Sequence, residues 1–139
     1  MKLSSLRSLI HEGLSVVPDW IVNAHPEEIL ATAQSHGTWL PHSMGWQMAR
    51  MVVWSGGRRG ARLTLFHVEG QVDPSCHRGF LYPDGAQFVV CCGEVTLNNQ
   101  KIGPGGSFSV EPGGSIAPAH QPGTVVLAYW KRPPEPRCC

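Results

Sequence analysis

From residue 38 onward, hydrophobic residues fall in short runs that are separated by turn-forming residues. The runs are rich in β-branched and aromatic residues, which is typical of β-strands. They cover 46–54, 62–68, 88–92, 95–97, 107–110 and 124–130. Clusters of Gly, Pro and Asn lie between them, and Ser55-Gly56-Gly57 joins the first two runs as a hairpin. Short strands at this spacing predict an all-β sandwich or barrel.

The first 37 residues have a different pattern. Leu3, Leu6, Leu9 and Ile10 recur at helical spacing, which predicts one or two helical turns before Gly13. Residues 20–22 are a short apolar stretch, and we expect an extended piece there that covers a sheet edge or is exchanged between protomers. A homodimer is therefore expected.

A second helix is predicted from Pro26 to Ser35. Proline is favoured at the first helical position, and Glu27 and Glu28 place negative charge in the first turn, where the helix dipole stabilises it. Gly37 then interrupts the pattern. The apolar face of this helix would consist of Ile29, Leu30 and Ala33.

These patterns divide the chain into three parts. Residues 1–37 form a helical and extended N-terminal segment, and residues 38–132 form the β domain. Residues 133–139 contain three prolines and no periodicity, so we expect a loose C-terminal tail.

Composition narrows the classes of partner. Charged residues make up 15% of the chain, against about 25% in a typical domain, and the net charge is +1. Neither nucleic acid nor an anionic membrane is therefore an expected partner, and no apolar run approaches the roughly 20 residues of a membrane span. The five cysteines include two adjacent pairs rather than a spaced disulfide framework, and no leader sequence precedes them, so a cytoplasmic location is expected.

Five short pieces occur in a recognisable order on this β pattern. They are Trp39-Leu40-Pro41, Gly56-Gly57-Arg58, His77-Arg78, the run 87–90 that closes on Gly93-Glu94-Val95, and the two Pro-Gly turns at 102–105 and 110–113. Across residues 45–129 the chain resembles a small single-domain cupin, of the group that includes the ChrR-like cupin domain and acetylacetone dioxygenase. The resemblance implies a jelly-roll β-barrel, preceded here by a short helical segment.

The resemblance also implies metal ligands, and this chain departs from that pattern. The family motif is His-x-His followed by Glu, with a further His after the second Pro-Gly turn. His77 matches the first position, but Gly79 stands at the second, Ala86 at the Glu position and Ile116 at the last. Because a borderline divalent metal needs at least three N, O or S donors, we expect no metal cofactor. The alternative is a metal such as Fe or Zn held by rearranged ligands, namely His77, His120 and Cys92.

The expected pocket follows from two-residue alternation. If Ala86 points inward, then Phe88, Val90 and Cys92 also point inward, and Cys91 lies on the other face. The face of His67 depends on register, and Tyr82 is expected in a long loop at the cavity mouth. His120 is expected in an exposed loop. The predicted binding residues are His67, Tyr82, Phe88, Val90, Cys92, Ile116 and His120.

Three functions are compatible with these residues. The first is a metal-free cupin that binds a small hydrophobic or aromatic molecule, as a binding protein or as a lyase, isomerase or cyclase that uses His77 as acid or base. The second is a metal-dependent oxygenase or isomerase with altered ligands. The third is a sensory or structural module.

Overall fold

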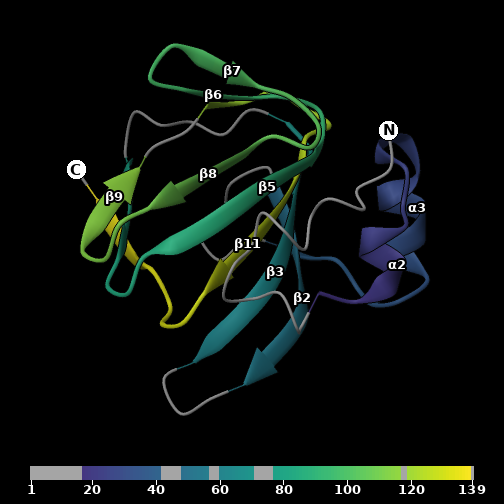
Figure 1. The fold of residues 1–139 in the computed structure, drawn as a ribbon, viewed down its shortest axis with the longest axis horizontal. Helices are drawn as coiled ribbons and strands as arrows, with labels where there is room; N and C mark the ends of the chain where they lie inside the picture. The colour runs from purple at the N-terminus through teal and green to yellow at the C-terminus, as the bar shows by residue number, and fades with distance from the viewer. Residues whose placement is uncertain (1–16, 42–47, 57–59, 71–76, 117–118, 139) are drawn as a thin grey trace.

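The computed structural model describes residues 17–41, 48–56, 60–70, 77–116 and 119–138, with the backbone alone at 77–79 and 136–138. The helical turns predicted around Leu3 to Ile10 lie outside these residues. The described chain is mostly β-strand, as the sequence predicted (Figure 1). None of its helices is long and apolar enough to cross a membrane.

The larger sheet has six antiparallel strands. Its order is β1 (Leu40–Pro41), β2 (Met48–Gly56), β3 (Ala61–Val68), β11 (Val125–Trp130), β5 (Ala86–Cys92) and β8 (Ser107–Val110). The predicted hairpin is β2–β3, in which Met51 lies opposite Leu65. The central strand β11 is buried along its whole length, which explains its unbroken apolar sequence.

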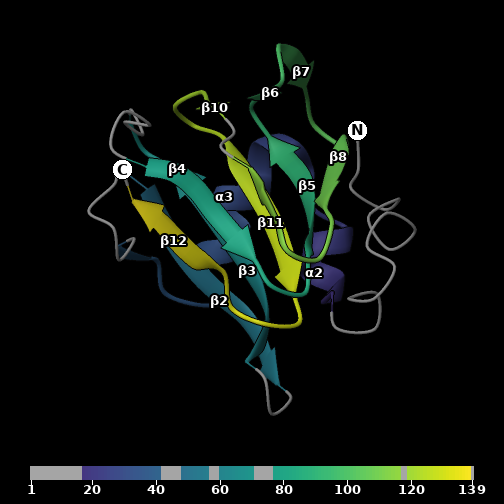
Figure 2. The ribbon, with the colours of Figure 1, turned by 90° about the vertical axis from the view of Figure 1, so that its left-hand side faces the viewer.

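Two smaller sheets complete a sandwich. One contains β10 (Ala119–His120), β6 (Val95–Leu97) and β7 (Gln100–Ile102), and the other contains β12 (Glu135–Cys138), β4 (His77–Tyr82) and β9 (Gly114–Ile116). Figures 1 and 2 show that β4 and β12 lie on one side of the large sheet and the helices on the other. The predicted all-β architecture is confirmed; the described strands form a β-sandwich of three sheets and do not close into the predicted barrel.

The helices cover the outer face of the large sheet (Figure 1). They are α2 (Asp19–Val22), the 3₁₀ turn η3 (Pro26–Glu28) and α3 (Ile29–Gln34). The helix predicted from Pro26 is therefore confirmed, with a tighter first turn. Ile29 and Ala33 are fully buried, as its predicted apolar face requires.

Two buried clusters use the two faces of the large sheet. The helix-side core comprises Val17, Ile21, Val22, Ala24, Ile29, Ala33, Met51, Leu63, Leu65, Val89, Cys91, Val125, Leu127 and Tyr129. The inner core lies inside the sandwich and comprises Tyr82, Ala86, Phe88, Val90, Val95, Val110, Val126, Ala128 and Trp130, with Phe66, Phe80, Ile102, Phe108 and Ile116 packed against it.

The prediction of an extended, exchangeable piece at residues 20–22 is wrong. These residues belong to α2, and Ile21 and Val22 are buried in the helix-side core of their own chain. Burial of both side chains against the sheet outweighs the low helix propensity of β-branched residues. The homodimer itself stays a prediction.

The prediction of a loose tail also differs from the structure. Residues 135–138 form β12, which pairs with β4 so that Pro136 lies opposite Phe80. Proline is tolerated because β12 is the edge strand of its sheet, where an N–H group is not needed on the open side. Its partner β4 is more than fifty residues away in sequence, so local composition carried no signal for this pairing.

Candidate functional site

Aromatic side chains line the interior of the sandwich. Phe88 stacks on Phe108 with ring centroids 4.8 Å apart, and Tyr82 meets the Phe88 ring edge-on at 5.7 Å. Phe66 and Trp130 lie 6.2 Å apart. Phe88 and Val90 belong to this inner core, and Ile116 packs against it. The predicted inward faces of these three residues agree with the structure.

Tyr82 lies in this wall rather than in a loop. It is the last residue of β4 and is 6% exposed. Burial raises the pKa of its phenol, so the group stays protonated at neutral pH. The expectation of a long loop at the cavity mouth is therefore wrong, because β9 extends β4 by pairing Tyr82 with Gly114.

His120 is also part of the interior. It lies in β10 directly opposite Val95 of the inner core, and residues opposite one another in an antiparallel pair share a face. Its Nδ1 atom is buried and has no hydrogen-bond partner among the described residues. Burial lowers its pKa to about 4, so the imidazole is neutral at pH 7. The expectation of an exposed loop histidine is wrong, because a short pairing with β6 encloses it.

Three further polar side chains on the inner face were missed by the sequence analysis. Thr64 lies opposite Ala128, Trp130 belongs to the inner core, and Arg50 lies opposite Phe66. Thr64 Oγ1, Trp130 Nε1 and Arg50 Nε are buried without a hydrogen-bond partner in the described part of the chain. A charged residue within the apolar stretch 48–54 was the one available signal for Arg50.

His67 does not face the interior. It lies opposite Val125 of the helix-side core, and its ring is 5.7 Å from that of Trp39. Desolvation lowers its pKa, and the charge of Glu69 opposes that shift. The register of β3 thus places the predicted binding residue His67 on the opposite face from the inner core.

Cys92 also differs from its predicted face. In the β11–β5 pairing Val126 lies opposite Val90, but Val125 lies opposite Cys92, so Cys91 is an extra residue in a bulge. The bulge cancels the alternation, and both Cys91 and Cys92 pack with the helix-side core. Cys91 is fully buried, which raises the pKa of its thiol to about 12.

His77 begins β4, and its backbone lies opposite Cys138. The pairing shifts register between Pro136 and Cys138, so β4 carries an extra residue next to His77. The side chain of His77 lies outside the described part of the structure. In Figure 2 the start of β4 lies at the same end of the sandwich as β10.

The described donor set does not fit a divalent metal. Ala86 and Ile116, which stand where the resemblance drawn from the sequence implies two ligands, are in or against the inner core and their side chains have no donor atom. Cys92, one member of the alternative ligand set, packs with the helix side. The described residues contain no group of three or more His, Cys, Asp or Glu side chains that could hold a metal ion.

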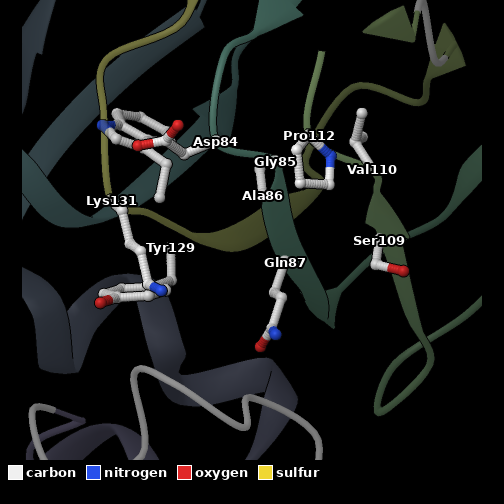
Figure 3. A pocket seen from close by; sticks show the side chains of 10 residues that line it. Asp84, Gly85, Ala86, Gln87, Ser109, Val110, Pro112, Tyr129 and Lys131 are labelled. Carbon is white, nitrogen blue, oxygen red and sulfur yellow. The ribbon is translucent and has the colours of Figure 1, made fainter. Parts of the chain in front are cut away.

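A hollow of about 240 Å³ lies at the end of the large sheet where β5 begins and β11 ends (Figure 3). Its lining includes Gln87, Ser109, Tyr129 and Lys131, which come from three strands and the turn after β11. Gln87 Oε1 is buried without a partner among the described residues. This hollow contains none of the predicted site residues, and its sequence-distant lining explains why no motif indicated it.

No protein-family model matches the chain, and no curated protein matches it in sequence. Solved structures match it in fold. A protein of unknown function with a cupin-like fold from Ralstonia eutropha JMP134 superposes with a TM-score of 0.59 at 14% identity, covering 73% of this chain and 71% of its own. KdgF from Halomonas sp. gives 0.53 at 12% identity, covering 71% and 92%. An acetylacetone dioxygenase from Acinetobacter johnsonii gives 0.55 at 5% identity, covering 66% of each chain. The fold of this chain is therefore that of the cupins.

Proposed function

We propose that the interior of the sandwich binds a small organic molecule with an aromatic or other apolar part. The observation that carries this proposal is the inner face itself, where four buried polar atoms have no hydrogen-bond partner among the described residues. They are Arg50 Nε, Thr64 Oγ1, His120 Nδ1 and Trp130 Nε1. Buried polar groups in native proteins nearly always have partners, so a bound molecule with its own polar groups would satisfy them.

We further propose that His77 is the acid or base of this site and that His120 is a neutral hydrogen-bonding group. An imidazole is suited to proton transfer near neutral pH because its ordinary pKa is about 6.5. His77 and His120 belong to strands that approach the same end of the sandwich, as Figure 2 shows for β4 and β10. The roles of the two histidines remain separable by substitution.

The chemistry proposed is independent of a metal. A neighbour of the same fold is named as an acetylacetone dioxygenase, which makes the oxygenase the natural competitor. Ala86 and Ile116 argue against it here, because the two positions from which the family supplies a carboxylate and an imidazole carry no donor. Binding alone, or acid–base chemistry such as isomerisation or elimination, needs neither donor.

Thermal-shift screening and native mass spectrometry of the full chain test this proposal, with aromatic and alicyclic compounds as the library. A ligand at a hundred times its Kd stabilises the protein by about 2.7 kcal/mol, which is a clear rise in Tm. We expect His77→Ala to abolish binding or turnover and His120→Ala to weaken binding. The control is His36→Ala, since His36 is exposed and stacks on Trp20 outside the sandwich, with ring centroids 4.5 Å apart.

Two results would contradict the proposal. One is a library without any stabilising compound. The other is ligand affinity that survives in His77→Ala and His120→Ala alike, which would place binding elsewhere. Chelator-washed protein should bind the same compounds with unchanged Kd, whereas loss of binding that returns with one equivalent of Fe or Zn would support the metal-dependent oxygenase.

A further inference from the structure

Arg50 places a positive charge on the inner face of the large sheet. It is the third residue of β2 and lies opposite Phe66, which packs against the inner core. The next residue, Met51, lies opposite Leu65 and belongs to the helix-side core. Since side chains alternate along a strand, the Arg50 side chain projects to the interior side of the sheet.

The Arg50 Nε atom has no hydrogen-bond partner in the described chain. The residue is half-buried, and its Nε atom is shielded from solvent. No ion pair to Arg50 occurs among the described residues. A partly desolvated cation without a counter-ion is unfavourable, and proteins normally pair such a group with a carboxylate.

None of the described carboxylates forms an ion pair with Arg50. Asp84 pairs with Arg132 at 3.5 Å, and Glu135 lies opposite Leu81, which faces away from the inner core. Asp19, Glu27 and Glu28 belong to the helices, and Glu94 and Glu111 to turns. Glu69 follows Val68, which lies opposite Met48 near Arg50, and its charge acts on His67. Within the described chain, no acidic side chain therefore forms an ion pair with Arg50.

We propose that Arg50 binds the anionic group of the ligand, and that the sandwich interior is a site for small aromatic carboxylates. This inference rests on the proposed function and specifies its substrate class. A guanidinium offers parallel N–H donors that match the two oxygens of a carboxylate, and the pairing is strengthened where water is partly excluded. The aromatic wall of Phe66, Phe88 and Trp130 then receives the ring of the ligand.

The end of the sandwich that holds Arg50 also holds His120. β2 begins there, and β3 ends at Val68, whose amide donates to Thr124 O in the segment that joins β10 to β11. A carboxylate at Arg50 would thus lie at the same end as the buried imidazole. The ligand class that fits is a monocarboxylate with one ring, and a neutral or cationic ring compound fits less well.

The probes for the test are trans-cinnamate and phenylacetate, each paired with its neutral amide, and Kd is measured by isothermal titration calorimetry. We expect the acids to bind at least 10-fold more tightly than the amides. Arg50→Met should reduce the affinity for the acids about 10- to 100-fold and leave the affinity for the amides unchanged. Arg50→Lys should recover part of the loss, because it restores the charge without the planar fork.

The matched control is Arg62→Gln. Arg62 lies opposite Trp130 at the far end of the same sheet face, and it is exposed. It carries the same charge, so an equal loss of affinity in Arg62→Gln and Arg50→Met would indicate general attraction of anions and would overturn the assignment to Arg50.

A stability readout separates a binding role from a structural one. Replacing an unpaired, partly buried cation by Met should raise the Tm of the ligand-free protein by about 3 °C, whereas loss of a structural arginine would lower it. A lower Tm with unchanged acid affinity would overturn the inference. Amides that bind as tightly as acids would overturn it too, while leaving the proposed function intact. Binding of neither series would contradict both.

Discussion

The two faces of the large sheet differ in what covers them. On the helix side, fully buried aliphatic residues such as Leu63, Leu65 and Leu127 pack against α2 and α3. On the inner side, the core is rich in aromatic rings, and several buried polar atoms have no partner among the described residues. Four of the six buried unpartnered side-chain atoms in the described chain lie on the inner face, and the other two belong to Trp39 and Gln87 on the helix side.

This difference indicates a division of roles. The helix-side face is completed by the protein's own helices, so its residues contribute to folding stability. The inner face holds four buried polar atoms without a partner in the described part of the chain, which supports the ligand site proposed above. Substitutions on the two faces should therefore affect different measurements.

The largest expected effect is on the helix side. Leu127 is fully buried between Leu65 and Val89, so Leu127→Ala removes apolar contacts and leaves a cavity. We expect a loss of about 4 kcal/mol in the free energy of unfolding, measured by urea denaturation. Ligand affinity of the folded fraction should not change. A parallel loss of affinity would contradict the division between the faces.

The next effect is a pH dependence on the inner side. The pKa of His120 is lowered to about 4 in the folded protein, against about 6.5 in the unfolded chain. Protonation of His120 therefore does not affect the free energy of unfolding above pH 6.5. As the pH falls from 6.5 toward 4, the free energy of unfolding decreases, because only the unfolded state takes up the proton in that interval. The loss is on the order of 3 kcal/mol.

Urea denaturation between pH 7.5 and 4.5 measures this dependence. His120→Gln removes the titrating group and should flatten the curve relative to the wild type. The comparison variant is His67→Gln, because the pKa of His67 is also lowered but a nearby Glu69 charge opposes the shift. Curves of equal slope for wild type and His120→Gln would show that the imidazole is not enclosed.

The smallest effect comes from a pair of buried threonines. The Thr124 hydroxyl donates to Glu94 O at 3.0 Å and accepts from Glu94 N at 3.1 Å, whereas Thr64 Oγ1 has no partner in the described chain. Thr124→Val should destabilise the protein by about 1–2 kcal/mol, and Thr64→Val should be neutral or stabilising by up to about 1 kcal/mol. Equal losses, measured by urea denaturation, would mean that the two hydroxyls have equivalent partners.

Much of this fold follows from local sequence. The two-residue pattern around Phe88 and Val90 predicted the inner face, and the Pro26-Glu27-Glu28 start predicted a helix at the right place. One of the predicted Asn-containing breaks, between the runs 95–97 and 107–110, begins with a turn at Asn98-Asn99, where both residues have the positive φ that such a tight turn requires and that asparagine tolerates. These features depend on backbone preferences and on burial patterns that neighbouring residues share.

Other features were decided only by tertiary structure. One extra residue at Cys91 reverses the face of Cys92, and the register of β3 sends His67 to the helix side. His120 lies on the inner side because β10 pairs with β6, and no local sequence pattern predicts that pairing. The role proposed for Arg50 depends on the strand register that turns it to the inner face and on the lack of a described partner for its Nε atom. Register, bulges and distant neighbours set these outcomes, because a strand specifies two faces but not which of them the rest of the chain will cover.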